Sequence, residues 1–404
     1  MRITLKILFT NSFTKFAMPK HTCLGLGLLL SLMSVMVQAQ TMRIPNDDTV
    51  LERLPANWRD SSAVLRAQQT QTQPTTASLA TLAPLAQQDI EHFRTTGDPR
   101  WLGIAQARLA PWQANPPPVA QLLFASIANG RHEFSTALRH LDDLLIQQPN
   151  NAQARLMRSN LHTLQGRYPA TIRDCGALYG QTSDLVFFSC LALPQSLSGK
   201  AAAAYTQLHT QLKTSQQDPP NVRAWAWGIL ADIAQRLGNT KAMHAHYKAA
   251  LMLAPQDVFL LSNYADALLL HQQPQQAYQL VQAFAQSDGI LLRRARAAQA
   301  LKLKSGDEDA QTLRRRFEAA IAHQEAGHER EWTYFYLYIQ PDASRALRYA
   351  QMNWQQQHEP IDAHLLLQAA SAAKQPQAAQ VVLQWQRDNQ VEDVTFNTLA
   401  ASFK

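Results

Sequence analysis

The sequence predicts an all-α protein in which helical hairpins stack side by side as a solenoid. Alanine, leucine and glutamine are abundant and only 14 of 404 residues are glycine, a composition that favours helices. Small and large apolar residues recur three or four positions apart, which places them on one helix face. This spacing repeats about every 34 residues from Leu79 to Asn389. One hairpin cannot bury its apolar stripe alone, so neighbouring copies are expected to cover it.

The first 39 residues have the pattern of a secretory signal peptide. Four basic residues precede the apolar run CLGLGLLLSLMSVMV, and small residues near Ala39 offer a cleavage site. A start at Met18 would give a signal of more ordinary length. The alternative is an uncleaved anchor, although the run is short for a bilayer span. We therefore expect an exported, periplasmic protein whose membrane contact is confined to this segment.

Charge argues against a nucleic-acid partner. The formal net charge of +7 falls to +3 when the four basic residues of the signal segment are removed. The rest of the chain has no basic stripe interleaved with aromatic residues, which nucleic-acid binding would need.

Residues 40–78 are predicted to be a loosely ordered lead-in. They are rich in polar residues, proline and threonine, with a short helix expected around residues 61–69. A first hairpin follows from Leu79 to Trp112, with Gly97-Asp98-Pro99 as its turn. The solenoid is expected over residues 79–394, and a closing helix over residues 395–404.

The stretch from Ala224 to Pro255 shows the design of one unit. Its first helix carries the stripe Trp227, Leu230, Ala231 and Ala234, and its second the stripe Met243, Tyr247, Ala250 and Leu251. Gly238-Asn239 supplies the turn between them, because glycine tolerates a left-handed backbone.

Two ladders of residues extend this design along the chain. The residues at which the first helices are expected to cross their partners are Ala125, Ser159, Ala192, Ala231, Ala265, Gln299, Tyr334 and Gln368. In the second helices they are Ala137, Thr171, Ala204, Met243, Ala277, Gln311, Ala346 and Gln380. The expected turns are Gly166-Arg167, Gly199-Lys200, Gly238-Asn239, Gln273-Pro274, Gly306-Asp307, Gln340-Pro341 and Gln375-Pro376.

The recurrence at about 34 residues, with two helices per unit, resembles the tetratricopeptide repeat. The residues that match its spaced pattern include Trp227, Leu230, Ala231, Ala234, Tyr247, Ala250 and Pro255. Units with Thr171, Met243, Gln299, Gln311 and Gln368 depart from the pattern where a small residue is usual. The resemblance implies a right-handed superhelix of about eight or nine hairpins, whose concave face is lined by the first helix of each unit.

Partner-binding residues are therefore expected on the concave face. The candidates are Asn160, Asp232, Arg236, Asn263, Asp266, Arg293, Arg296, Phe335 and Tyr338. Arg293 and Arg296, near Asn263, would suit a carboxylate, and the alternative is a solvated basic face. Phe335 and Tyr338 would anchor a partner's side chain, and the alternative is core packing.

Other chemistry has little support in the sequence. Cys175 and Cys190 are open to either a disulfide or a pair of buried thiols. The histidines have neither metal-ligand spacing nor carboxylate neighbours, so no metal and no cofactor is expected. No nucleophile elbow or nucleotide loop is present, so we do not expect an enzyme.

These observations predict an exported, non-catalytic scaffold that binds a protein or peptide partner. The alternative is a structural component of a cell-envelope export or assembly machine, held by an uncleaved N-terminal segment. The sequence specifies neither the partner nor the oligomeric state.

Overall fold

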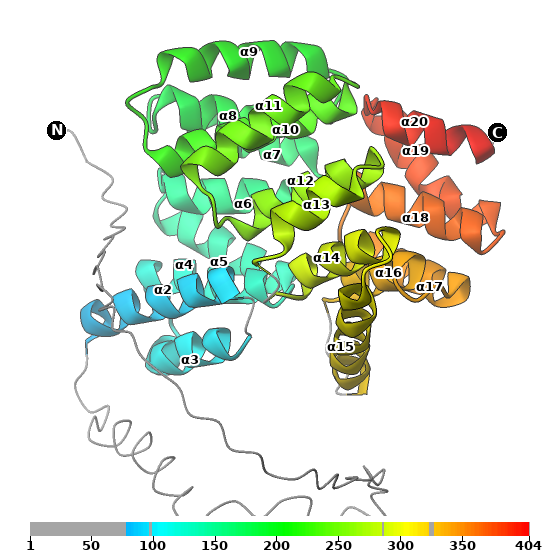
Figure 1. Ribbon diagram of the computed structural model, residues 1–404. Coiled ribbons are helices and arrows are strands. Elements are labelled where there is room, and N and C mark those ends of the chain that lie inside the picture. The colour runs from blue at the N-terminus through cyan, green and yellow to red at the C-terminus, as the bar shows by residue number, and fades with distance from the viewer. Residues whose placement is uncertain (1–77, 97–98, 285–286, 323–326, 404) are drawn as a thin grey trace, which may run out of the picture. The chain divides into compact units, whose positions relative to one another are not determined.

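A computed structural model describes residues 78–96, 99–284, 287–322 and 327–403, and over these residues the chain is helical without a strand (Figure 1). The predicted signal peptide, its cleavage near Ala39, the lead-in and the short helix around residues 61–69 lie outside the described residues. None of the described helices is both long and apolar enough to span a bilayer.

The described helices form nine hairpins and a terminal helix. The hairpins are α2 (Leu79–Thr96) with α3 (Arg100–Leu109), α4 (Pro118–Gly130) with α5 (Phe134–Gln147), α6 (Ala152–Leu164) with α7 (Tyr168–Gly176), α8 (Asp184–Ser196) with α9 (Ala201–Thr214), α10 (Pro220–Arg236) with α11 (Thr240–Leu253), α12 (Val258–Leu270) with α13 (Pro274–Val281), α14 (Asp288–Ala300) with α15 (Lys304–Ala322), α16 (Glu329–Tyr338) with α17 (Ala343–Trp354), and α18 (Pro360–Ala372) with the 3-10 turn Pro376–Ala379 and α19 (Gln380–Asn389). Helix α20 (Val394–Ala400) and the 3-10 turn Ala401–Phe403 follow.

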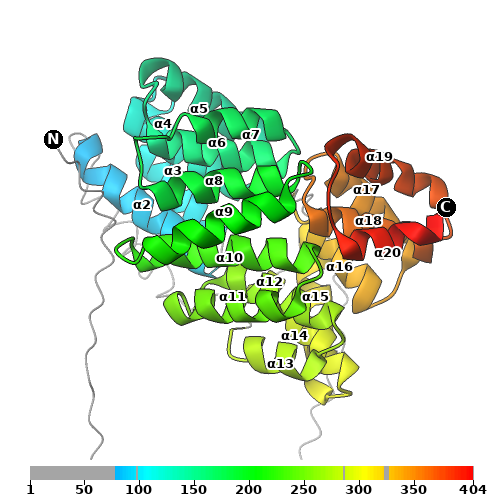
Figure 2. The same cartoon turned by 90° about the horizontal axis from the view of Figure 1, so that it is seen from above.

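The hairpins stack in chain order. Each first helix packs on its own second helix, and first helices of successive units also contact each other, as α6 does α8 and α14 does α16. Figure 2 shows this succession from α4 to α13. The predicted α-solenoid is therefore confirmed over the described residues.

A left-handed residue ends the first helix in most units. The backbone φ is 59° at His132, 70° at Gly166 and Gly199, 76° at Gly238, 56° at Gln272, 58° at Lys302 and 54° at Lys374. Only glycine takes this conformation without strain, so four units accept a modest cost to keep the same turn. The turn geometry is thus more regular than the turn residues.

These turns fix the register of the stack. The residue seven positions before each is almost completely buried, at 2% exposure or less: Ala125, Ser159, Ala192, Ala231, Ala265, Ala295 and Leu367.

The sequence ladder is wrong in two late units, where it named Gln299 instead of Ala295 and Gln368 instead of Leu367. The turn expected at Gly306-Asp307 is also wrong, because Lys302 makes the turn and Gly306 lies inside α15. A Cβ on Gly306 would lie 2.9 Å from the backbone N of Gln299, so this glycine permits a close helix approach instead.

The last units fold back over the hairpin turns of the middle units. His358 N donates a hydrogen bond to Leu164 O at 2.7 Å, beside the α6–α7 turn. Ala201 N, at the α8–α9 turn, donates to Glu392 Oε2 at 2.7 Å. The α10–α11 turn touches the start of α20, because a Cβ on Gly238 would lie 3.4 Å from Val394. Figure 2 shows α16 to α20 along this edge.

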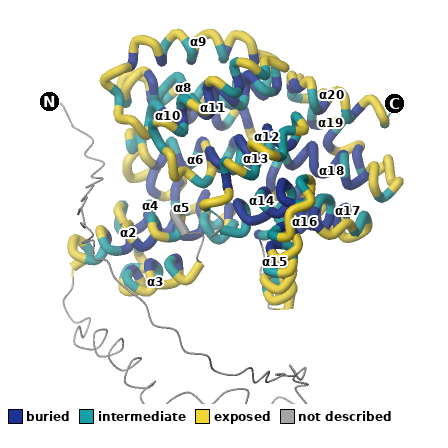
Figure 3. The backbone as a smooth tube through the Cα atoms, in the orientation of Figure 1, coloured by how far each residue is buried: buried dark blue, intermediate teal, exposed yellow. Residues whose placement is uncertain are grey.

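One apolar core joins the two regions. Tyr168 from α7 and Leu197 after α8 pack into the same cluster as Trp354, Trp385 and Phe396 of the last units. Figure 3 shows α14 and α18 mostly buried, whereas α9 and α15 have long exposed faces. The exposed surface of the solenoid therefore lies mainly on second helices.

Candidate functional site

Several residues predicted to line an open concave groove are instead buried. Arg236 is 5% exposed, Arg293 8% and Phe335 1%. For these three the expectation of an open groove is wrong, because contacts between successive first helices and with the folded-back units cover them. Asn160 is exposed, and the other candidates, Asp232, Asn263, Asp266, Arg296 and Tyr338, are half-buried.

Four of the predicted residues meet in one internal network. Arg293 donates from Nε and Nη2 to Asp266 Oδ2 at 3.0 and 2.5 Å. Tyr334 Oη donates to Asp266 Oδ1 at 3.1 Å and accepts from Arg296 Nη1 at 3.1 Å. The Arg296 guanidinium also lies 3.7 Å from the ring centroid of Tyr338. Of the two arginines expected to hold a partner's carboxylate, Arg293 already binds Asp266 of its own chain, and Arg296 is engaged by Tyr334 and Tyr338.

Two more predicted residues lie near each other, each in its own internal bond. Arg236 donates to Ser196 O at 2.9 Å and to its Oγ at 2.6 Å. Asp232 accepts a hydrogen bond from Tyr247. Burial raises the pKa of Asp232 to about 6, although the Tyr247 bond and the Arg236 charge oppose that rise. Burial also lowers the pKa of Arg236.

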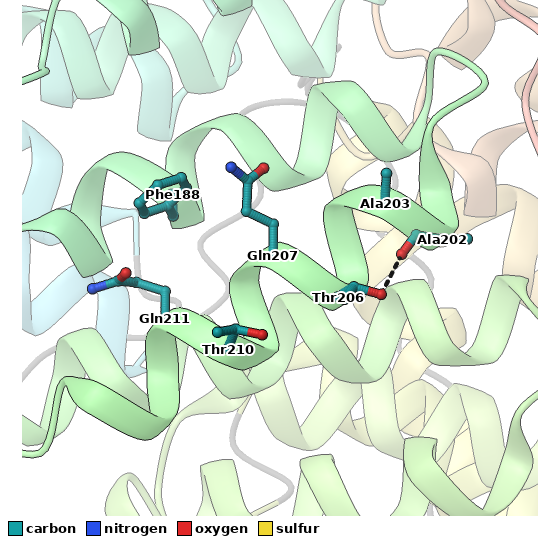
Figure 4. Close-up of a pocket in the computed structure, with 7 residues that line it drawn as sticks. All are labelled: Phe188, Ala202, Ala203, Thr206, Gln207, Thr210 and Gln211. Carbon is teal, nitrogen blue, oxygen red and sulfur yellow. Dashed lines mark hydrogen bonds between the residues drawn. The ribbon is translucent and has the colours of Figure 1, made fainter.

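An open cleft of about 780 Å³ lies along α8 and α9. Its lining residues are Phe188, Ala202, Ala203, Thr206, Gln207, Thr210 and Gln211. Figure 4 shows Phe188 on one helix and the other six on the neighbouring helix, with Thr206 Oγ1 donating to Ala202 O. None of the lining residues is titratable or was predicted as a site residue. We call this the α8–α9 cleft.

A second cleft, of about 350 Å³, occupies the equivalent place one unit earlier. It is lined by Arg155, Arg158, His162, Ala170, Arg173 and Asp174, and we call it the α6–α7 cleft. Arg155 lies four residues before Ser159, as Phe188 lies four before Ala192. The two clefts therefore have the same position in successive units, but the α6–α7 cleft is lined by charged residues and the α8–α9 cleft by uncharged ones.

A disulfide stands beside the α6–α7 cleft. Cys175 is joined to Cys190, and their Cα atoms are 5.5 Å apart. The sequence left this pairing open. Because Cys175 directly follows Asp174, the bond ties the cleft-bearing α7 to the next helix, α8.

No group of three or more potential metal ligands meets within the described part of the chain. His244 and His246 have different partners, Tyr264 and Tyr205. His246 also belongs to an aromatic cluster, 5.0 Å from Trp227 and 5.7 Å from His209 between ring centroids. Burial, then the His209 charge, lowers the pKa of His246 to about 4.

The sequence analysis missed both clefts because it placed function on first-helix residues of the concave face. The sequence did contain one signal for the α6–α7 cleft, in the residues next to the buried crossing residues. One residue before the crossing residue, most units carry a large apolar side chain, whereas α6 carries Arg158.

The chain matches no family model and no curated protein. Among solved structures it is similar to a tetratricopeptide repeat protein from Parabacteroides merdae, with 14% identity and a TM-score of 0.35, over 71% of this chain and 98% of that one. It is also similar to the tetratricopeptide repeat domain of P58(IPK), with 16% identity and a TM-score of 0.24, over 80% of this chain and 97% of that one. The tetratricopeptide-like fold is carried by the chain's own hairpins, which keep one turn geometry and one register of buried crossing residues.

Proposed function

We propose that the chain is an exported, non-catalytic scaffold that binds a protein or peptide partner in the α8–α9 cleft. The observation that carries this proposal is an open, uncharged cleft on a rigid stack of hairpins. Solenoids of this type present long surfaces, and their repeats hold the binding residues in fixed positions.

The lining of the cleft suits a peptide. The Phe188 ring offers a flat apolar contact for a partner's side chain. The amides of Gln207 and Gln211 can both donate and accept hydrogen bonds, so they match the alternating N–H and C=O groups of a peptide backbone. The lack of charged lining residues disfavours a strongly ionic ligand.

A binding role is also the better account of the cleft's chemistry. General acid–base catalysis needs a titratable group within hydrogen-bond reach of the substrate, and the α8–α9 cleft has none in its lining. Asp232, with its raised pKa, and the buried Arg236 are engaged in internal bonds.

Two features support the exported location. The first 39 residues have the pattern of a signal peptide. The Cys175–Cys190 disulfide suits an oxidising compartment. N-terminal sequencing of the protein from a membrane-free extract tests this point, with a mature start near Gln40 as the expected result. An intact N-terminal segment held in the membrane would favour the envelope-machine alternative.

Site-specific cross-linking tests the binding surface. A photoactivatable amino acid placed at Gln207 in the exported chain should form an adduct with the partner in intact cells. The same probe at the exposed Glu318 of α15 is the matched control, and a probe at Asn160 tests the concave face. The Ala203→Arg substitution should abolish the Gln207 adduct, because it puts a long charged side chain into the cleft. An adduct at Asn160 alone would place the partner elsewhere and refute the proposed site.

A further inference from the structure

In α6, Arg158 occupies a position next to the crossing residue at which most units have an apolar residue. One position before the crossing residue, the other units with a left-handed turn residue carry Phe124, Leu191, Leu230, Tyr264, Arg294 and Leu366. Only α6 and α14 have arginine among these. Positions at which a chain breaks its own local rule are often functional, because the break lowers stability unless something else offsets it.

The α14–α15 unit shows what such an arginine does when it serves structure alone. Arg294 donates from Nε and Nη2 to both oxygens of Asp309 at 2.8 and 2.7 Å. Arg158 does the same to Asp174 in the α6–α7 unit, at 2.8 and 2.6 Å. One arginine matched by one aspartate therefore completes the link between the two helices of a unit. It does not require a ligand.

The α6–α7 cleft contains more positive charge than this link uses. Arg155 Nη1 lies 3.1 Å from Oδ1 of the same Asp174, so two guanidinium groups share one carboxylate. Asp174 is almost completely buried, with its side chain 4% exposed. Arg158 Nη1 also reaches Asp142 of α5 at 2.7 Å, but that carboxylate is 56% exposed. Arg173 adds a third guanidinium to the lining.

Two hydrogen-bonding groups of the lining are unused within the described residues. The exposed Arg173 guanidinium makes neither an ion pair nor a side-chain hydrogen bond with any of them. The Nδ1 atom of His162 is buried and has no hydrogen-bond partner there. A buried polar atom without a partner costs free energy, which a ligand accepting or donating a hydrogen bond would recover.

We propose that the α6–α7 cleft binds an oxyanion, a carboxylate or phosphate group, between Arg155, Arg173 and His162. Guanidinium groups bind both oxyanions through charge-assisted hydrogen bonds. The volume of about 350 Å³ lies at the low end of ligand pockets, so it fits a small anion or one acidic side chain. The disulfide at Cys175 holds α7 in place beside the site, which limits the ordering cost of binding. This inference does not rest on the proposed function.

Isothermal titration calorimetry on the mature chain tests the site, with inorganic phosphate and succinate as separate probes at constant ionic strength. We expect millimolar or tighter binding of at least one probe to a single site. Binding of phosphate alone would assign the site to phosphate groups, and binding of succinate alone would assign it to carboxylates.

The Arg173→Gln variant should weaken binding about tenfold or more, because it removes a charged donor that has no internal partner. The matched control is Arg314→Gln, which removes an exposed arginine on α15 and should leave binding unchanged. Equal losses in both variants would show general charge attraction and overturn the proposal. So would the absence of binding by both probes.

A second variant separates binding from folding. The pair Arg158→Leu with Asp174→Leu gives α6 the apolar residue found in most units and removes the buried carboxylate. Replacing a buried ion pair with apolar residues is often neutral or stabilising. We therefore expect an unchanged or higher midpoint of thermal unfolding together with anion binding that is retained or tighter, because Arg155, Arg173 and His162 remain and Arg155 no longer has a carboxylate of its own chain. Loss of anion binding in this folded variant would refute the assigned site.

Discussion

Arg293 gives the most direct test of whether the residues predicted for the concave face stabilise the fold or bind a partner. It is 8% exposed and donates to Asp266 through two nitrogens and to Gly289 O through a third, at 2.8 Å. Replacement by methionine keeps much of the apolar stem but leaves Asp266 with Tyr334 as its remaining donor. Removing one partner of a buried ion pair costs about 3–5 kcal/mol of unfolding free energy. Arg293→Glu should cost more, because it adds a like charge beside Asp266.

Urea unfolding followed by far-UV circular dichroism and tryptophan fluorescence measures this loss. At about 3 kcal/mol per molar urea, the midpoint should fall by about 1–2 M in Arg293→Met. The double variant Arg293→Met with Asp266→Leu should recover most of the loss, because it removes the buried charge as well. Arg314→Glu on α15 is the control and should change stability by about 0.5 kcal/mol or less. If Arg293→Glu unfolds at the wild-type midpoint, the internal role assigned to this network is refuted.

Three further predictions concern pH, the disulfide and the folded-back end. The pKa of His246 is lowered from 6.5 to about 4, so the unfolded chain binds more protons than the folded chain between these pH values. The free energy of unfolding should therefore fall as the pH drops through this window, and it should fall less in His246→Phe. Urea midpoints measured across this pH range check both expectations. Serine at both Cys175 and Cys190 should cost about 3 kcal/mol, because the disulfide closes a 15-residue loop, and peptide mapping without reductant should show the bond. Phe396→Ala should lower the free energy of unfolding by about 3–5 kcal/mol and speed hydrogen exchange at the Ala201 amide, because the C-terminal end covers that amide. Exchange at the wild-type rate would contradict the contact between the C-terminal end and the α8–α9 turn.

Local pattern was enough to predict the helical hairpins. The turn at Gly238-Asn239 and the start of α13 at Pro274 were found from residue type, because glycine and proline restrict the backbone directly. The same reasoning failed at Lys302, where a lysine takes the left-handed turn and Gly306 lies inside a helix. Tertiary packing decides this case, because it places a lysine in a backbone conformation that local preference alone would give to glycine.

The exposed fraction of the residues predicted for the concave face could not be predicted from the sequence of one unit. Arg293 and Asp266 are 27 residues apart, and their pairing depends on how tightly successive first helices approach. The contact between Ala201 and Glu392 spans 191 residues and depends on rotation accumulated over many hairpins. The accumulated rotation cannot be read from a single repeat, because each repeat specifies only its packing on its neighbours.

The folded-back end also explains why the two clefts are the better functional candidates. The turn edges of the α6, α8 and α10 units are covered by His358, Gln390 and Val394, so a partner there would have to displace these segments of the chain itself. The clefts on α7 and α9 need no such displacement, because they are open in the folded chain. Binding in either cleft is therefore compatible with the folded-back C-terminal units, whereas binding at the covered turns would require these units to separate from the middle of the stack.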